Sequence, residues 1–262
     1  MKFLIQKING EIRHDFVYVL MESIRFRNWL QNAEKIKYRF FDTTEDGVDF
    51  KFKPLHRHYV PVGTVEFVSS FINHFYGLTP KPMNVPWELR VYPLFSKRRI
   101  TDCTDVEVMT LKNTVKLFVK SNDKIKGYSE IIDTSKEFQV PAGNYQISDY
   151  LTGIESEWRA FVYNDILVGL QNYCGEFTLF PNPETIKNMI KAFKSAPIAY
   201  TLDVGVRNVD YYQKETIIIE AHDFFSCGLY GFSNLAIYPQ MLHRWFWQYI
   251  QREMVNQKLN TL

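Results

Sequence analysis

The stretch TIIIEAHDFFSCGLYGF, residues 216–232, begins like a buried strand and then changes character. Residues 216–219 form a short apolar, β-branched run, which is typical of a strand in a protein core. Glu220, His222 and Asp223 follow directly. The end of a predicted core strand therefore contains two carboxylates and an imidazole. The partners of these groups are the main clue to function.

A second strand is predicted at IAYTLDVGV, residues 198–206, and a polar segment centred near residues 211–212 joins the two. Asp203 and Glu220 lie about equally far from that centre, so an antiparallel pairing places them opposite each other. Opposed carboxylates repel unless a cation or a proton lies between them. Neither has a basic partner close in sequence, so we expect a divalent metal, with Mg²⁺ or Mn²⁺ favoured by oxygen ligands. The alternative is a rim of solvated charges at the strand ends.

The composition predicts a folded protein with a large core. The chain has 262 residues, of which 46% are hydrophobic and 16% aromatic, enough for one large domain or two small ones. Its 31 basic and 29 acidic side chains leave a formal charge of only +2. This balance gives no reason to expect a nucleic-acid or anionic membrane partner.

The cysteines and the N-terminus favour a soluble, cytoplasmic protein. Three cysteines without CxxC spacing argue against a disulfide framework and against a thiolate zinc site. The first apolar run is broken by Gln6 and Lys7, too early for a signal peptide. No stretch approaches the roughly 18 apolar residues of a membrane-spanning helix.

The first third of the chain alternates strands and helices. Strands are expected at 3–8, 38–42 and from 59, and helices at 15–30 and up to residue 75. The prolines of LTPKPMNVPWEL, residues 78–89, suit a connector better than a regular element. After it, SKRRI (Lys97, Arg98, Arg99) is predicted to be a basic surface turn, with anion binding as the alternative.

The remainder is predicted to be mainly antiparallel β-structure. Strands are expected at 114–120 and near 130–134, and a hairpin at 157–173 turns at Asn164 and Asp165. A helix over 182–193 starts at the N-cap Asn182. The lysines of the loop SNDKIKGYSE can bind phosphates or be merely solvated, whereas Arg159 inside a strand needs an anionic partner.

These segments, in this order, resemble the ATP-grasp superfamily. The lysine-bearing strand and loop, EWRAFV, YTLDVGV and IIIEAHDFFSCGLYGF are similar to a small bacterial and phage-associated clade that is labelled by one arginine and two lysines. VPVGTVEFV and PMNVPWEL also resemble its N-terminal unit. The similarity spans about residues 58–240.

The resemblance implies an α+β fold with two α+β lobes that hold ATP, preceded by a small α/β unit. The expected N-terminal unit is residues 1–88 and the ATP-grasp domain is residues 89–262. Within that domain, the smaller lobe is expected at about 110–150 and the larger at about 151–262.

The resemblance also assigns roles to single residues. Lys120 and Lys126 would contact the phosphates of ATP, and Arg159 would join them. Asp149, in YQISDYL at the adenine hinge of the family, would contact the ribose or the adenine. Among these, Lys126 and Arg159 are the residues expected to act on the reacting phosphate.

Asp203 and Glu220 match the acidic metal ligands of the superfamily. The third ligand there is usually an asparagine, and this chain has His222 in its place. An imidazole is a poor ligand for Mg²⁺ and a better one for Mn²⁺. Asp223 is therefore an alternative third ligand, and His222 could instead act on the substrate.

The expected function is an ATP-dependent ligase that joins a small-molecule or peptide carboxylate to an amine through an acyl phosphate, assisted by two metal ions. The alternative is a non-catalytic nucleotide-binding module that serves as a sensor or scaffold, for which the departure at His222 is the support. A nucleic-acid binder that uses SKRRI and the aromatic C-terminal helix is a third possibility, and the near-neutral charge counts against it.

Overall fold

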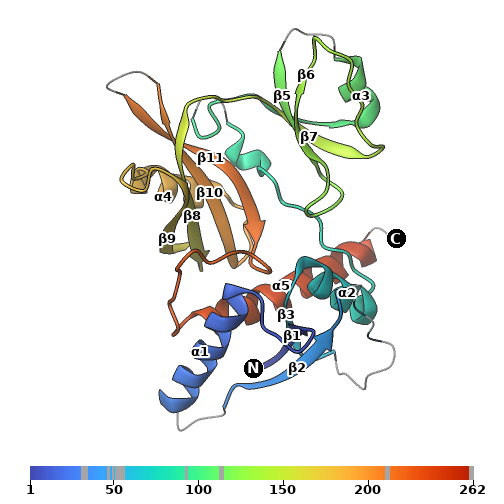
Figure 1. Ribbon diagram of the computed structural model, residues 1–262, viewed down its shortest axis with the longest axis vertical. Helices are drawn as coiled ribbons and strands as arrows, with labels where there is room; N and C mark the ends of the chain where they lie inside the picture. The colour runs from blue at the N-terminus through green and yellow to red at the C-terminus, as the bar shows by residue number, and fades with distance from the viewer. Residues whose placement is uncertain are drawn as a thin grey trace. The chain divides into compact units, whose positions relative to one another are not determined.

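The computed structural model describes residues 1–30, 35–45, 48, 50, 57–91, 94–111, 115–209 and 213–259. Its strands form three sheets, each accompanied by helices (Figure 1). The chain divides into two compact units: Met1–Pro80 with Pro197–Ala199 and Phe224–Leu262, and Lys81–Ala196 with Tyr200–Asp223. No helix among the described residues is both long and apolar enough to cross a membrane.

The first unit contains a parallel sheet of order β2-β1-β3. The helix α1 connects β1 to its parallel neighbour β2, as a crossover must, and α2 follows β3. The expected strands and helices of this part of the chain are confirmed, and their bounds are β1 Lys2–Ile8, α1 Asp15–Leu30, β2 Lys37–Thr43, β3 Val60–Val62 and α2 Val65–Tyr76.

The long C-terminal helix α5, Tyr238–Leu259, belongs to this first unit and packs against α1 and β3. Leu242, Trp245 and Phe246 are buried at helical spacing, and Trp245 stacks on Phe225 at 4.7 Å between ring centroids. These aromatic side chains are core, so they offer no base-stacking platform. Compact packing thus groups residues 224–262 with the N-terminal unit, whereas the expected division into domains 1–88 and 89–262 stays a prediction.

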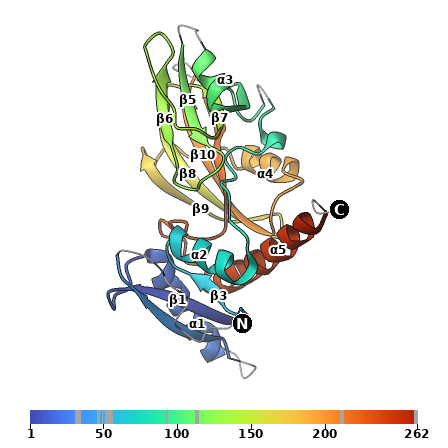
Figure 2. The same cartoon turned by 90° about the vertical axis from the view of Figure 1, so that its right-hand side faces the viewer.

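One sheet of the second unit is antiparallel, with order β4-β7-β5-β6; Figure 2 labels β5, β6 and β7 of this sheet. Its small core contains Val108 of the helix α3 together with Val119 and Tyr145. Thr104 and Glu107 form a capping box that starts α3. The elements are β4 Ile100–Thr104, α3 Asp105–Thr110, β5 Lys116–Ser121, β6 Ser129–Asp133 and β7 Asn144–Asp149.

The other sheet has the order β11-β10-β8-β9. The predicted hairpin is confirmed, because Asn164 and Asp165 have φ angles of 49° and 58°, as a two-residue turn with both central residues left-handed requires. The helix α4 also begins at its predicted N-cap, where Asn182 accepts from two backbone N–H groups. The elements are β8 Ile154–Tyr163, β9 Ile166–Gly175, α4 Pro183–Ala192, β10 Ala199–Asn208 and β11 Lys214–Asp223.

The two faces of this sheet differ in polarity. Leu202 and Val204 of β10 join the buried residues of α4 in one apolar core. Side chains alternate along a strand, so Thr201 and Asp203 lie on the other face. The sheet therefore has one face that builds the core and one that carries charged groups.

A bulge in β11 sorts its side chains between these faces. Asp203 pairs with Glu220, whereas Val204 pairs with Ile218, so Ile219 is an extra residue. Ile218 and Ala221 both reach the apolar core, although they are three residues apart. Because of the bulge, Glu220 faces the polar side together with Asp203.

Candidate functional site

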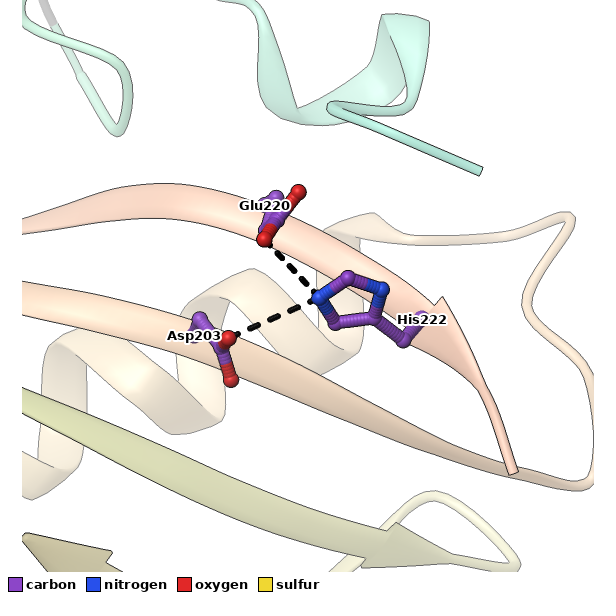
Figure 3. Close-up of side chains that lie close together, drawn as sticks. All are labelled: Asp203, Glu220 and His222. Atoms are coloured by element: carbon purple, nitrogen blue, oxygen red, sulfur yellow. Dashed lines mark ion pairs between the residues drawn. The ribbon is translucent and has the colours of Figure 1, made fainter. Parts of the chain in front are cut away.

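Asp203, Glu220 and His222 converge at the polar face of β10 and β11 (Figure 3). The Nε2 atom of His222 lies 2.9 Å from Oε1 of Glu220 and 3.5 Å from Oδ2 of Asp203. The predicted pairing of Asp203 with Glu220 is confirmed by the strand register. The turn expected at 211–212 lies outside the described residues.

Asp203 is bound by Arg159 of the neighbouring strand β8. Nε of Arg159 donates to Oδ1 at 2.8 Å, and Nη2 donates to Oδ2 at 2.7 Å. The side chains are 9% and 4% exposed, so this two-pronged ion pair is largely shielded from water. Burial by itself raises the pKa of Asp203, but hydrogen bonds from Arg159 and His222 outweigh it and hold the pKa below its usual value.

Lys120 of β5 is the second cation of the site, and its partner is Glu220. Nζ of Lys120 forms an ion pair with Oε2 of Glu220, and both side chains are mostly buried. Burial lowers the pKa of Lys120 to about 8, against the opposing effect of the Asp203 charge. This pair joins the two sheets of the second unit at the site.

Neither carboxylate has a basic partner close in sequence, as expected, but the folded chain supplies a distant one to each. Arg159 and Asp203 are 44 residues apart in sequence and meet only because β8 and β10 are neighbours. The charges run from Arg159 through Asp203 and Glu220 to Lys120, with His222 between the two carboxylates. A metal ion is thus not needed to relieve their repulsion.

The same residues nevertheless fit a divalent ion. Asp203, Glu220 and His222 each offer a ligand atom, and these atoms all lie within 4.8 Å of one another. Opposite ligands across a Mg²⁺ ion are about 4.2 Å apart, since each bond is about 2.1 Å long. Two carboxylate oxygens and an imidazole nitrogen form a donor set that Mn²⁺ accepts more readily than Mg²⁺.

Strand alternation separates the two candidates for the third metal ligand. Asp223 follows His222 directly at the end of β11, so the two side chains leave the strand on opposite faces. His222 shares its face with Glu220 and belongs to the cluster of possible ligands. The geometry favours His222 over Asp223.

Lys126 and Asp149 are not part of this ion-pair cluster. Lys126 is exposed on the turn between β5 and β6, with a φ of 55°, and makes no ion pair within the described part of the chain. Asp149 ends β7, where its Oδ2 accepts from the backbone N–H of Arg99 at 3.1 Å. Their expected contacts with nucleotide stay predictions.

Tyr173 is a residue of the site that sequence analysis missed. The guanidinium of Arg159 lies over its ring, 5.7 Å from the centroid, and its hydroxyl donates to Glu157 at 2.6 Å. Burial raises the pKa of Tyr173, so the phenol stays a neutral donor. No signal in the sequence could have revealed it, because counting from the hairpin turn pairs Arg159 with Leu170, and only the bulge between Phe161 and Val162 shifts the partner to Gln171.

Arg98 is the second missed residue, because SKRRI was expected to be a surface turn. Its guanidinium donates to the carbonyl oxygens of Ile218 at 2.7 Å and Ile219 at 3.0 Å. Burial lowers the pKa of Arg98 to about 10, against the opposing charge of Asp149. Arg98 therefore binds the edge of β11 at its bulge and remains charged at neutral pH.

Comparison with solved structures gives distant likenesses. D-alanine–D-alanine ligase from Bacillus anthracis is 10% identical, with coverage of 97% of this chain and 99% of that chain and a TM-score of 0.48. The RimK domain ATP-grasp protein from Sphaerobacter thermophilus is also 10% identical, with coverage of 96% and 100% and a TM-score of 0.49. The macrocyclase MdnC from Microcystis aeruginosa, bound with its precursor peptide MdnA, is 10% identical, with coverage of 92% and 99% and a TM-score of 0.46. Comparison with curated proteins gave no match.

The sequence model of one protein family matches residues 95–239, which is more than half of the chain. The matched segment contains all five residues of the ion-pair cluster, from Lys120 to His222. The match confirms the superfamily and the α+β fold expected from the sequence. The chain belongs to family 2 of the R2K clade of ATP-grasp domains.

Proposed function

We propose that the protein is an ATP-dependent ligase that joins the carboxylate of a small molecule or peptide to an amine. The observation that carries this proposal is the cluster of Arg159, Asp203, His222, Glu220 and Lys120 on one polar face, within a chain of the ATP-grasp family. Cations and metal-binding oxygens set side by side are what phosphoryl transfer requires, because its catalysis is mainly positioning and charge neutralisation.

Lys120 is the residue proposed to bind the phosphates. Its ammonium is held at Glu220 and can exchange that carboxylate for a phosphate oxygen by rotation of its side chain. Arg159 holds Asp203 in place and adds positive charge beneath the site. We assign phosphate contact to Lys126 as well, and ribose or adenine contact to Asp149.

Asp203, Glu220 and His222 would hold Mg²⁺ or Mn²⁺, and the bound ion would neutralise phosphate charge. In the proposed reaction an oxygen of the substrate carboxylate attacks the γ-phosphorus and ADP leaves. The amine then attacks the acyl carbon, phosphate leaves, and the amine loses a proton as the amide forms. The chain supplies charge and orientation, and none of its residues needs to form a covalent bond.

The test measures ATP binding by calorimetry with and without Mg²⁺, followed by ADP release over a panel of carboxylates and amines. Lys120→Ala should weaken ATP binding and ADP release. Lys187→Ala is the matched control, because Lys187 lies exposed on α4 and, among the described residues, forms its ion pair with Glu184 alone. Equal ATP affinity in wild type and Lys120→Ala would contradict the assignment of Lys120.

A nucleotide-binding module without turnover is the second candidate. Two observations favour it: His222 stands where the superfamily usually has asparagine, and Arg159 and Lys120 already neutralise both carboxylates. Such a module would bind ATP and release no ADP with any acceptor pair. Acceptor-dependent ADP release that Asp203→Asn abolishes would exclude it.

A further inference from the structure

The connector, defined as the described residues 81–91 and 94–99 between α2 and β4, covers the outer edge of β11. Since β11 is the last strand of its sheet, its outward N–H and C=O groups need partners from elsewhere. Ile218 donates its N–H to the carbonyl of Phe95 at 3.0 Å, and Ala221 donates to the carbonyl of Asn84 at 2.7 Å. The connector thus binds β11 on both sides of its bulge.

Asn84 also binds the other sheet of the same unit. Its Nδ2 donates to the carbonyl of Ser121 at 3.0 Å and to Oδ1 of Asn122 at 2.7 Å. Ser121 follows Lys120 in the chain, and Ala221 follows Glu220. A single residue is therefore hydrogen-bonded to the backbone next to each member of the Lys120–Glu220 ion pair.

The surroundings of Asn84 match its amide donor and its backbone conformation, whereas its Oδ1 has no hydrogen-bond partner among the described residues. The residue is 2% exposed and has a φ of 50°, a left-handed conformation that asparagine tolerates better than most residues. The next residue, Val85, exchanges two hydrogen bonds with the side chain of Gln146, at 3.1 and 3.2 Å. Gln146 is the β7 partner of Lys120 in the sheet register. The strand of Lys120 and its neighbour β7 are thus both tied to the connector.

We propose that Asn84 is a positioning residue that holds the strand of Lys120 against the strand of Glu220, and so sets the site for nucleotide and metal together. The family match begins at residue 95, so Asn84 lies outside the matched segment. What the cluster binds rests on the proposed function, whereas the coupling of the two strands through Asn84 does not.

Asn84→Asp is the sharpest variant. It keeps the shape, the left-handed conformation and the carbonyl that Ala221 needs, but replaces a donor with an acceptor that faces two oxygens. Asn84→Gly is the second variant, since it keeps the backbone conformation and removes the amide without adding a charge. Asn164→Asp is the control, because it makes the same change at a left-handed, exposed position in the β8–β9 turn.

The first measurement is amide hydrogen exchange in the protein without nucleotide. Asn84→Asp and Asn84→Gly should each accelerate exchange in residues 117–122 of β5 as well as 218–222 of β11, while Asn164→Asp should change neither. Unchanged exchange in 117–122 for both Asn84 variants would overturn the proposal. This result does not depend on ATP, so it decides the proposal even if the wild type binds none and the proposed function fails.

The second measurement is a double-mutant cycle on the affinity for ATP with Mg²⁺. Asn84→Asp should lower the affinity at least about tenfold, since both hydrogen bonds donated by the buried amide are disrupted. In a Lys120→Ala background the same change should have little further effect, because Asn84 acts through the position of Lys120. Equal losses in both backgrounds would overturn the proposal in favour of a general structural role.

Discussion

Asp203→Asn removes the negative charge from a carboxylate that binds Arg159 through both of its oxygens. The two side chains are only 4% and 9% exposed, so the guanidinium loses its counter-charge in a place that water hardly reaches. Arginine cannot release its proton there. We therefore expect Asp203→Asn to destabilise the protein, contrary to the stabilisation that repulsion between Asp203 and Glu220 would suggest.

The magnitude follows from the geometry. A buried ion pair that loses one partner costs about 3–5 kcal/mol. The amide oxygen of asparagine still accepts one of the two hydrogen bonds from Arg159, which recovers about 1 kcal/mol. The net loss in the free energy of unfolding is about 2–4 kcal/mol, which corresponds to a fall of roughly 10 °C in Tm for a protein of this size.

Glu220→Gln is the matched control. Its partner Lys120 has a pKa lowered to about 8 by burial, so the lysine can lose its proton at modest cost when the counter-charge is removed. Both side chains are also more exposed, at 21% and 26%. We expect a loss below about 1 kcal/mol.

The assay is urea unfolding of wild type, Asp203→Asn and Glu220→Gln with a common slope. The double variant Arg159→Met with Asp203→Leu should recover most of the lost stability, because it removes both buried charges. An Asp203→Asn protein as stable as wild type would refute the reasoning and show that repulsion between the carboxylates dominates.

Three further predictions concern ionisation and metal choice. ATP affinity should fall as pH rises through about 8, where Lys120 loses its proton, whereas calorimetry on Lys120→Arg should give a flat profile from about pH 7 to 10; parallel profiles would exclude Lys120 as the phosphate ligand. His222→Asn should shift ADP release from a preference for Mn²⁺ toward Mg²⁺, and an unchanged preference would exclude His222 as a ligand. Because the pKa of Asp203 is lowered in the folded protein, its ionised carboxylate stabilises the fold above the ordinary pKa of 3.8, and this stabilisation is lost as the pH falls further. Acid unfolding of Asp203→Asn should therefore lack this part of the pH dependence. The same acid dependence in both proteins would contradict the ion pair with Arg159.

Local sequence patterns predicted much of the fold. The helix expected at 15–30 is α1, and the hairpin turn at Asn164 and Asp165 has the left-handed angles that its residue types favour. Each of these two features depends on neighbours in the chain, so the sequence contains enough information to locate it. The opposition of Asp203 and Glu220 was predicted by counting outward from a turn, but it also needs the bulge, because the register from Asn208–Lys214 to Val204–Ile218 would otherwise place Ile219 opposite Asp203.

The partners of the charged residues could not be predicted in this way. Arg159 meets Asp203 because β8 lies beside β10, and Lys120 meets Glu220 because a strand of the other sheet reaches the site. Neither strand order nor the approach of two sheets leaves a periodic mark in the sequence. Local patterns therefore indicate two carboxylates without a nearby cation, whereas the folded chain supplies a cation to each.

The sequence by itself determined which groups the site contains: a carboxylate and an imidazole at the end of a β-branched strand, a second carboxylate on the strand before it, and an arginine and a lysine on other strands. The tertiary structure decided how they combine. The extra residue Ile219 turns Glu220 toward Asp203. On either side of Glu220, Asn84 binds the backbone of Ala221, and Arg98 binds the carbonyls of Ile218 and Ile219. The physical reason is that local composition sets which atoms are available, whereas hydrogen bonds between segments distant in sequence set the distances at which charges act.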